Sequence, residues 1–211
     1  MVKVISAKSK VKVARVKIAK PFSDADKNAL LQLARAAIKE FLAKGAAQDT
    51  PKNLPAKLPA RLKTKVGVFV SLHKEGQLRG CIGNLAATRQ LHKAVEENAL
   101  AAAFSDPRFS PLTIEELPAT NIEISVLTNP RLLRFSSPGD LLKKLQTNFG
   151  VILEHKGQTA TFLPQVWEML SDKESFLQNL CLKAGLPADA WRLPETKIYV
   201  YMAEVFRETV G

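Results

Sequence analysis

Cysteine and histidine are scarce in this 211-residue chain, and neither is arranged for a cross-link or a metal site. The two cysteines, Cys81 and Cys181, lie 100 positions apart, which is not the spacing of a disulfide scaffold. A reducing, cytoplasmic compartment is the simplest expectation. The three histidines are scattered and share no metal-ligand spacing with the cysteines. We therefore predict neither a metal nor a cofactor.

Long apolar runs are also absent. The longest extends only from Ala99 to Phe104, far short of the roughly 20 residues that cross a bilayer. The basic N-terminus has no apolar segment, so it does not resemble a secretory signal. A mitochondrial presequence would be rich in Arg and Ser, whereas residues 1–20 hold one Arg. With 46% apolar residues, the chain is expected to fold, and no membrane contact is expected.

Acidic residues are missing from the N-terminus, and this explains much of the net charge of +11. Residues 1–20 carry seven Lys or Arg and no acid, and residues 44–65 carry six against Asp49. Residues 66–211 are nearly neutral, with fifteen basic and sixteen acidic groups. The basic segments could bind nucleic acid weakly and without sequence preference, or serve as a solvated arm.

The pattern of helices and strands predicts an α+β fold with a mainly antiparallel sheet, because it lacks a βαβ rhythm. We expect a basic extension over 1–20, which could hold an edge strand at 10–18, and a domain over 21–211 with a proline-rich, extended connector at 51–62. Helices are expected at 23–45, 88–104, 140–147 and 173–186, with a short one near 113–116. Strands are expected at 66–83 as a hairpin, at 122–126, at 150–167 as a second hairpin turning at Lys156-Gly157, and at 197–206.

The first hairpin is the most informative segment. A three-residue turn at Lys74-Glu75-Gly76 pairs Ser71 with Arg79 and Phe69 with Cys81, and a two-residue turn is rejected because it would mix the faces. The apolar face then holds Val68, Val70, Leu72, Leu78, Gly80 and Ile82. Gly80 leaves room on that face for another backbone, and the Ala-rich helix at 88–104 is the natural occupant.

Arg79 and Cys81 share the opposite face, about 7 Å apart along the strand. A guanidinium nearby favours the reactive thiolate, which makes Cys81 a candidate catalytic nucleophile. The alternative is that Cys81 lines a site or only packs. This register puts His73 about 13 Å from Cys81, too far for a general base.

Other polar residues have two readings each. Asp106 and Arg108 either form the mouth of a site or are a turn cap and a surface arginine, and Glu123 either pairs with Arg79 or Arg108 or faces solvent. Asn98 either donates to a ligand or satisfies a buried backbone group. Cys181 lies in an apolar helix and is expected to pack.

Four separated stretches together resemble one family: GVFVSLHKEGQLRGCIG (67–83), AAFSDPRFSPL (102–112), ISVLT (124–128), and TFLPQVW with KAGL (161–167 and 183–186). They are similar to the AMMECR domain family, in which LRGCIG (78–83) is the hallmark. The resemblance covers roughly residues 23–205. It implies a single α+β domain of a larger and a smaller lobe, with the hexapeptide at the cleft.

The resemblance also implies site positions at Arg79, Gly80, Cys81, Gly83, Asp106 and Arg108. Prokaryotic members resemble one component of a three-part set with a Memo-type protein and a radical S-adenosylmethionine enzyme, and no reaction is established for them. Two hypotheses result. One is a ligand or substrate site between the lobes, built on Arg79 and Cys81 with Glu123 nearby. The other is a non-enzymatic module that binds a protein or, through its basic segments, nucleic acid.

Overall fold

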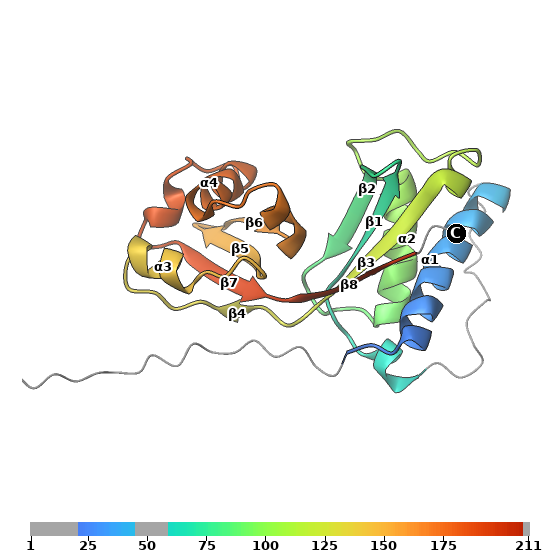
Figure 1. Cartoon of the computed structure of the whole chain (residues 1–211), viewed down its shortest axis with the longest axis horizontal. Coiled ribbons are helices and arrows are strands. Elements are labelled where there is room, and N and C mark those ends of the chain that lie inside the picture. Colours follow the sequence, from blue (N-terminus) through green and yellow to red (C-terminus); the bar gives the residue numbers. More distant parts are fainter. Residues whose placement is uncertain (1–20, 45–58, 209–211) are drawn as a thin grey trace, which may run out of the picture.

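Two antiparallel sheets, each with its own helices, make up the described part of the chain (Figure 1). The computed structural model describes residues 21–44 and 59–208. The larger lobe has the sheet order β2-β1-β3-β8 and the smaller lobe the order β4-β7-β5-β6. The elements of the larger lobe are α1 (Asp24–Lys44), η1 (Ala60–Lys63), β1 (Val68–Lys74), β2 (Gln77–Asn84), α2 (Leu91–Phe104), η2 (Leu117–Ala119), β3 (Thr120–Leu127) and β8 (Ala203–Arg207). Those of the smaller lobe are β4 (Arg131–Leu132), α3 (Pro138–Lys144), β5 (Gly150–His155), β6 (Gln158–Phe162), η3 (Pro164–Glu168), α4 (Lys173–Lys183), η4 (Ala190–Arg192) and β7 (Lys197–Tyr201).

The smaller lobe is an insertion between β3 and β8. The chain leaves the larger lobe after β3 and returns at β8, and the two crossing segments are bonded to each other. Thr128 donates its backbone N–H to the carbonyl of Met202 (2.8 Å), and Met202 donates its N–H to Thr128 Oγ1 (2.9 Å). Sequence periodicity predicts one strand over 197–206, but the structure divides it at Met202 into two strands of different sheets. Strand character is local, whereas the choice of sheet depends on distant partners.

Helices α1 and α2 cover one face of the larger sheet (Figure 1). Ser23 caps α1 by accepting the N–H of Asp26 at 3.2 Å, and Leu30, Ala34 and Ile38 of the predicted stripe are buried. The predicted glycine contact is confirmed: a Cβ on Gly80 would overlap the carbonyl oxygen of Ala102 in α2. Only a glycine lets α2 approach β2 this closely.

The register predicted for the first hairpin is wrong. The turn has two residues, Glu75 and Gly76, with φ of 53° and 77° as in a type I′ turn. Ser71 pairs with Cys81 and Leu72 with Gly80, because Arg79 is an extra, bulged residue in β2. Without the bulge, a two-residue turn would place Arg79 opposite Leu72 and mix the apolar and polar faces. The extra residue restores the alternation of the two faces. It also moves Leu78 off the apolar face, where it was predicted, to a position opposite His73 that is 41% exposed.

The smaller lobe has a separate aromatic core. Trp167 stacks on Phe176 with ring centroids 3.6 Å apart, and Cys181 is fully buried beside them, as predicted. The turn at Lys156-Gly157 is confirmed, with φ of 49° and 85°. Between the lobes lies a third apolar cluster, made of Phe69, Leu85, Leu127, Ile152, Leu163, Tyr199, Tyr201 and Ala203.

Other expectations meet different outcomes. The connector predicted as extended to residue 62 is a 3-10 helix from Ala60, while 51–58 lies outside the described residues. The short helix near 113–116 is a turn followed by the 3-10 helix η2. The extension at 1–20, including the strand proposed at 10–18, also lies outside the described part. Within the described ranges, no helix combines the length and apolarity needed to span a bilayer.

Candidate functional site

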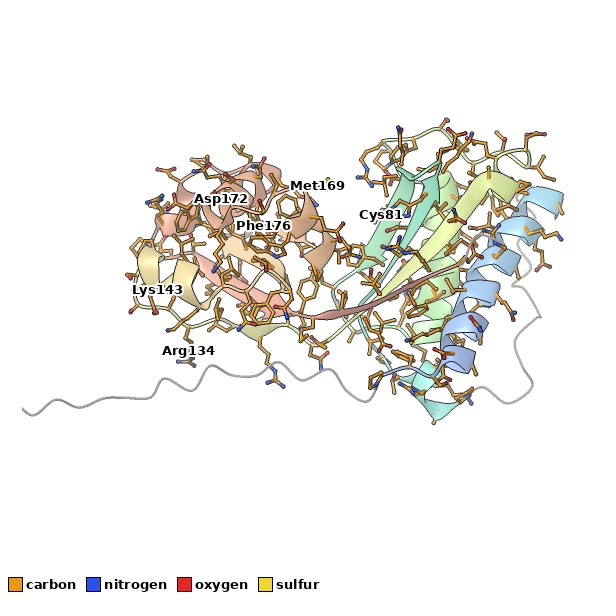
Figure 2. All side chains as sticks on the ribbon, in the orientation of Figure 1. Cys81, Arg134, Lys143, Met169, Asp172 and Phe176 are labelled. Atoms are coloured by element: carbon orange, nitrogen blue, oxygen red, sulfur yellow. The ribbon has the colours of Figure 1, made fainter. Side chains whose placement is uncertain are left out.

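Cys81 lies in edge strand β2, on the sheet face that the helices leave uncovered. That face is turned toward the smaller lobe (Figure 2). The residue is half-buried, and its sulfur accepts a hydrogen bond from Ser71 Oγ at 3.2 Å. Cys81 is therefore neither sealed in a core nor freely solvated.

Asp106 fixes the backbone of Cys81. Its Oδ2 accepts the N–H of Cys81 at 2.8 Å, and Arg108 Nη2 donates to the Cys81 carbonyl at 3.3 Å. Because β2 is an edge strand, these two side chains satisfy backbone groups that no neighbouring strand pairs. Hydrogen bonds from the Arg108 side chain, and then from the Cys81 amide, hold the pKa of Asp106 well below its usual range. The Asp106 carboxylate is 2% exposed, so it acts as a buried clamp.

Arg108 is held by Asp106 but remains accessible. Its Nη2 lies 2.7 Å and its Nε 2.9 Å from the Asp106 oxygens, yet the side chain is 55% exposed. Its Nη1 makes no hydrogen bond within the described ranges. The guanidinium thus keeps donors for a further group.

Arg79 has a different partner from the one the sequence suggests. Its Nη2 lies 2.9 Å from Glu116 Oε2 and its Nε 3.3 Å from Glu116 Oε1, and the side chain is 12% exposed. The bonds from Arg79 and Lys74 lower the pKa of Glu116 to about 2. Arg79 Nη1 is buried without a hydrogen-bond partner. The bulge directs this guanidinium to the loop after α2, so it anchors that loop instead of activating Cys81.

Lys183, at the end of α4, is a residue that sequence reasoning missed. Its Nζ donates to the carbonyl of Thr161 at 3.0 Å and lies 5.0 Å from the centroid of the Phe162 ring. Burial, and then the positive charge of Arg108, lower the pKa of Lys183. Lys183 is the first residue of the KAGL stretch (183–186), but no local pattern marks it as a site residue, because its position relative to Arg108 depends on how the two lobes are placed.

The charges around Cys81 come from both lobes. Burial raises the pKa of its thiol, and this outweighs the lowering by the Ser71 hydrogen bond and by the charges of Arg108 and Lys183. The thiol is therefore protonated at neutral pH. The corrected register places His73 two residues along β1 from Ser71, a rise of roughly 7 Å, and no hydrogen bond joins it to Cys81.

Glu123 pairs with neither of the two arginines that were predicted. It lies in one row across the sheet with Cys81, Ser71 and Arg207, and its ion-pair partner is Arg207 at 3.4 Å. Gln165 of the smaller lobe donates Nε2 to Glu123 Oε1 (3.2 Å) and to Ser125 Oγ (3.0 Å). Glu123 thus takes part in a hydrogen-bonded contact between the lobes.

The remaining candidates have structural contacts. A Cβ on Gly83 would overlap the ring of Phe69, which belongs to the cluster between the lobes. Asn98 Nδ2 donates to the carbonyl of Val68 at 3.0 Å, the second of its two predicted roles. Among the residues that the structure describes, no group of three or more His, Cys, Asp or Glu is placed to hold a metal ion.

Comparison with known proteins decides the family. Residues 31–206 match the family model described as AMMECR1. The chain belongs to the AMMECR1 family. A protein of Methanothermobacter thermautotrophicus is 41% identical over 190 residues, which cover 89% of this chain and 97% of the relative. Protein PF1979 of Pyrococcus furiosus is 41% identical over 186 residues, 85% of this chain and 86% of the relative.

A solved structure agrees with the fold. The crystal structure of the uncharacterized protein PH0010 from Pyrococcus horikoshii superposes with a TM-score of 0.79 at 37% identity, covering 88% of this chain and 93% of that one. The α+β architecture with antiparallel sheets in a larger and a smaller lobe is thus common to this AMMECR1 protein and its relative.

Proposed function

We propose that this AMMECR1-family protein binds a ligand or substrate where its lobes face each other, at a site formed by Cys81, Arg108 and Lys183. One observation carries the proposal: a half-buried thiol faces the smaller lobe, with Arg108 bonded to its backbone carbonyl at 3.3 Å and Lys183 held at the boundary between the lobes by the carbonyl of Thr161. These residues come from β2, the loop after α2 and the end of α4, segments far apart in the sequence. Cys181, by contrast, is fully buried in an apolar core.

The other predicted site residues support this site in the proposal. Arg79 anchors the loop that carries Asp106, and Asp106 positions both Cys81 and Arg108. Glu123 joins the lobes through Gln165. Gly80 and Gly83 shape β2 by admitting α2 on one face and Phe69 on the other.

The properties of Cys81 favour ligand binding over nucleophilic catalysis in the protein without its ligand. The Cys81 thiol has a raised pKa, and its hydrogen-bond partner is the hydroxyl of Ser71, which is no general base at neutral pH. Cys81 then recognises the ligand directly, and any reaction through its sulfur takes its base from the substrate or a partner protein.

Cys81 is expected to react with iodoacetamide in the native protein, while Cys181 stays unmodified. Because burial raises the pKa of Cys81, its rate should keep rising with pH above the ordinary cysteine value. The reaction is run at several pH values from about 7 to about 10. Samples taken at successive times are digested, and the modified cysteines are mapped by mass spectrometry. Protein unfolded in denaturant, in which both cysteines react, is the control. A native Cys81 as inert as Cys181 would refute the site.

Partners form a further part of the proposal. The protein acts in the cytoplasm with a Memo-type protein and a radical S-adenosylmethionine enzyme, which modify or receive the bound substrate. Family membership alone supports this part. Co-expression of the three proteins followed by size-exclusion chromatography tests it, and separate elution of all three would count against it.

A second candidate function, nucleic-acid binding, is favoured by the charge of residues 1–20. With seven Lys or Arg and no acid there, the full chain should bind a nucleic-acid column at about 50 mM salt and elute by about 200 mM. Deletion of 1–20 should abolish this retention. The truncated chain keeps the basic segment 44–65 and the nearly neutral residues 66–211, and it supplies the internal control. Retention unchanged by the deletion would rule out the N-terminal segment as the binding element.

A further inference from the structure

We infer that the ligand of the Cys81 site is an anion, with a carboxylate or phosphate group held between Arg108 of the larger lobe and Lys183 of the smaller lobe. This inference rests on the proposed function and names its ligand class.

Arg108 is prepared for such a ligand. Asp106 engages Nε and Nη2 and fixes the plane of the guanidinium, while Nη1 has no partner within the described ranges. Ring contact with Phe109, 5.4 Å from the guanidinium carbon to the centroid, also orients the group. A planar guanidinium with a free donor edge is well suited to bind carboxylate or phosphate oxygens.

Lys183 is a cation without a counter-ion. Several lysines of the described part pair with carboxylates, as Lys74 does with Glu116 and Lys197 with Glu154. Lys173, like Lys183, donates instead to a backbone carbonyl. Lys183 has no such partner there, and its single hydrogen bond to Thr161 leaves two N–H donors unused. The backbone bond and the neighbouring Phe162 ring hold its amine in place.

The acids near the site do not neutralise this lysine. Asp106 is occupied by Arg108 and the Cys81 amide, and Glu123 by Arg207 and Gln165. Cys81 is present as a neutral thiol, and the charges of Asp106 and Arg108 cancel. The site therefore has a net charge of one positive unit, which comes from Lys183. Lys183 lies at the boundary between the lobes, because Thr161, whose carbonyl it bonds, also joins its hydroxyl to that of Tyr201 in the cluster between the lobes. Burial lowers the pKa of Lys183, and repulsion from the positive charge of Arg108 lowers it further. An anion between them removes this repulsion and links the two lobes.

The test compares two alkylating reagents that attack the same sulfur. Iodoacetate is an anion and iodoacetamide is neutral, and in both reactions the thiolate displaces iodide and forms an S–C bond. A change in the pKa of Cys81 alters both rates equally, so the ratio of the rates measures the attraction of an anion alone. Rates at Cys81 are read by mass spectrometry on the full chain at low salt.

Lys183→Met is expected to lower the iodoacetate-to-iodoacetamide ratio about threefold to fivefold, and Lys183→Arg to preserve it. The matched control is Lys143→Met, because Lys143 is exposed at the far side of the smaller lobe from Cys81 (Figure 2), and it should leave the ratio unchanged. Inorganic phosphate, added at constant ionic strength, should slow both reactions in the original chain but not in Lys183→Met.

The outcomes separate the two proposals. If Cys81 reacts with both reagents and Lys183→Met leaves the ratio unchanged, the anion inference is wrong and the ligand site itself stands. If Cys81 reacts with neither reagent, the site and the inference both fall.

Discussion

Gly80→Ala is expected to lower the free energy of unfolding by about 3 kcal/mol, because the new methyl group would overlap the backbone of α2. The added Cβ would collide with the carbonyl oxygen of Ala102 and lie 3.1 Å from its carbonyl carbon. Neither atom belongs to a flexible side chain, so the whole helix or strand β2 must move. Since Cys81 follows Gly80, a shift of β2 should also disturb the hydrogen bond between the Cys81 amide and Asp106. Equilibrium unfolding in urea measures the loss.

Gly139→Ala is the matched control for this substitution. Gly139 lies in α3, and the nearest atom to its added Cβ is Ser137 Oγ at 4.0 Å. The same change of residue there should be neutral or stabilise by about 0.5 kcal/mol, since alanine restricts the unfolded chain. Equal stabilities of the two variants would show that α2 does not approach β2 as closely as described.

Asp106→Asn is expected to destabilise the protein by about 3 kcal/mol at neutral pH. The carboxylate is 2% exposed and accepts hydrogen bonds from the amides of Cys81 and Arg108 as well as from the Arg108 side chain. An asparagine has only one acceptor oxygen, so its NH₂ group would face one of these donors. Arg108 would lose its fixed orientation. Arg108 and Lys183 should then no longer act together on the rate at which iodoacetate labels Cys81.

The pH dependence distinguishes lost charge from lost packing. The pKa of Asp106 lies well below its unfolded value, so its stabilisation is fully present above about pH 4 and is lost as the pH falls through the folded-state pKa. The difference in stability between the original chain and Asp106→Asn should therefore begin to narrow below about pH 4 and continue to narrow as the pH falls further. Asp140→Asn is the control, because Asp140 pairs with Lys144 at the surface and its loss should be much smaller. A gap that stays constant into acid would assign the effect to packing.

The first hairpin shows how far local sequence reasoning reaches. Alternation correctly placed Val68, Val70 and Leu72 on the apolar face, and the turn was located within one residue. The sequence prediction excluded a two-residue turn without allowing for an extra residue in β2. The ion pair of Arg79 with Glu116, a residue of a later loop, is not visible in the local pattern. The candidate site, too, was predicted only in part. Cys81 and Arg108 were named from the sequence, but the cation of the smaller lobe was not.

By itself the sequence determined the family resemblance, the α+β class, the buried stripe of α1, the turn at Lys156-Gly157 and the glycine that admits α2. These features depend on short-range sterics and on the periodic spacing of apolar residues, and both can be read from positions that are close together in the sequence. Tertiary structure alone decided the division of the last strand at Met202, the partner of Arg79, and the position of Lys183 at the boundary between the lobes. Those contacts join residues that are remote along the chain. Their free energy depends on how two separately packed lobes are placed, and no local pattern encodes that placement.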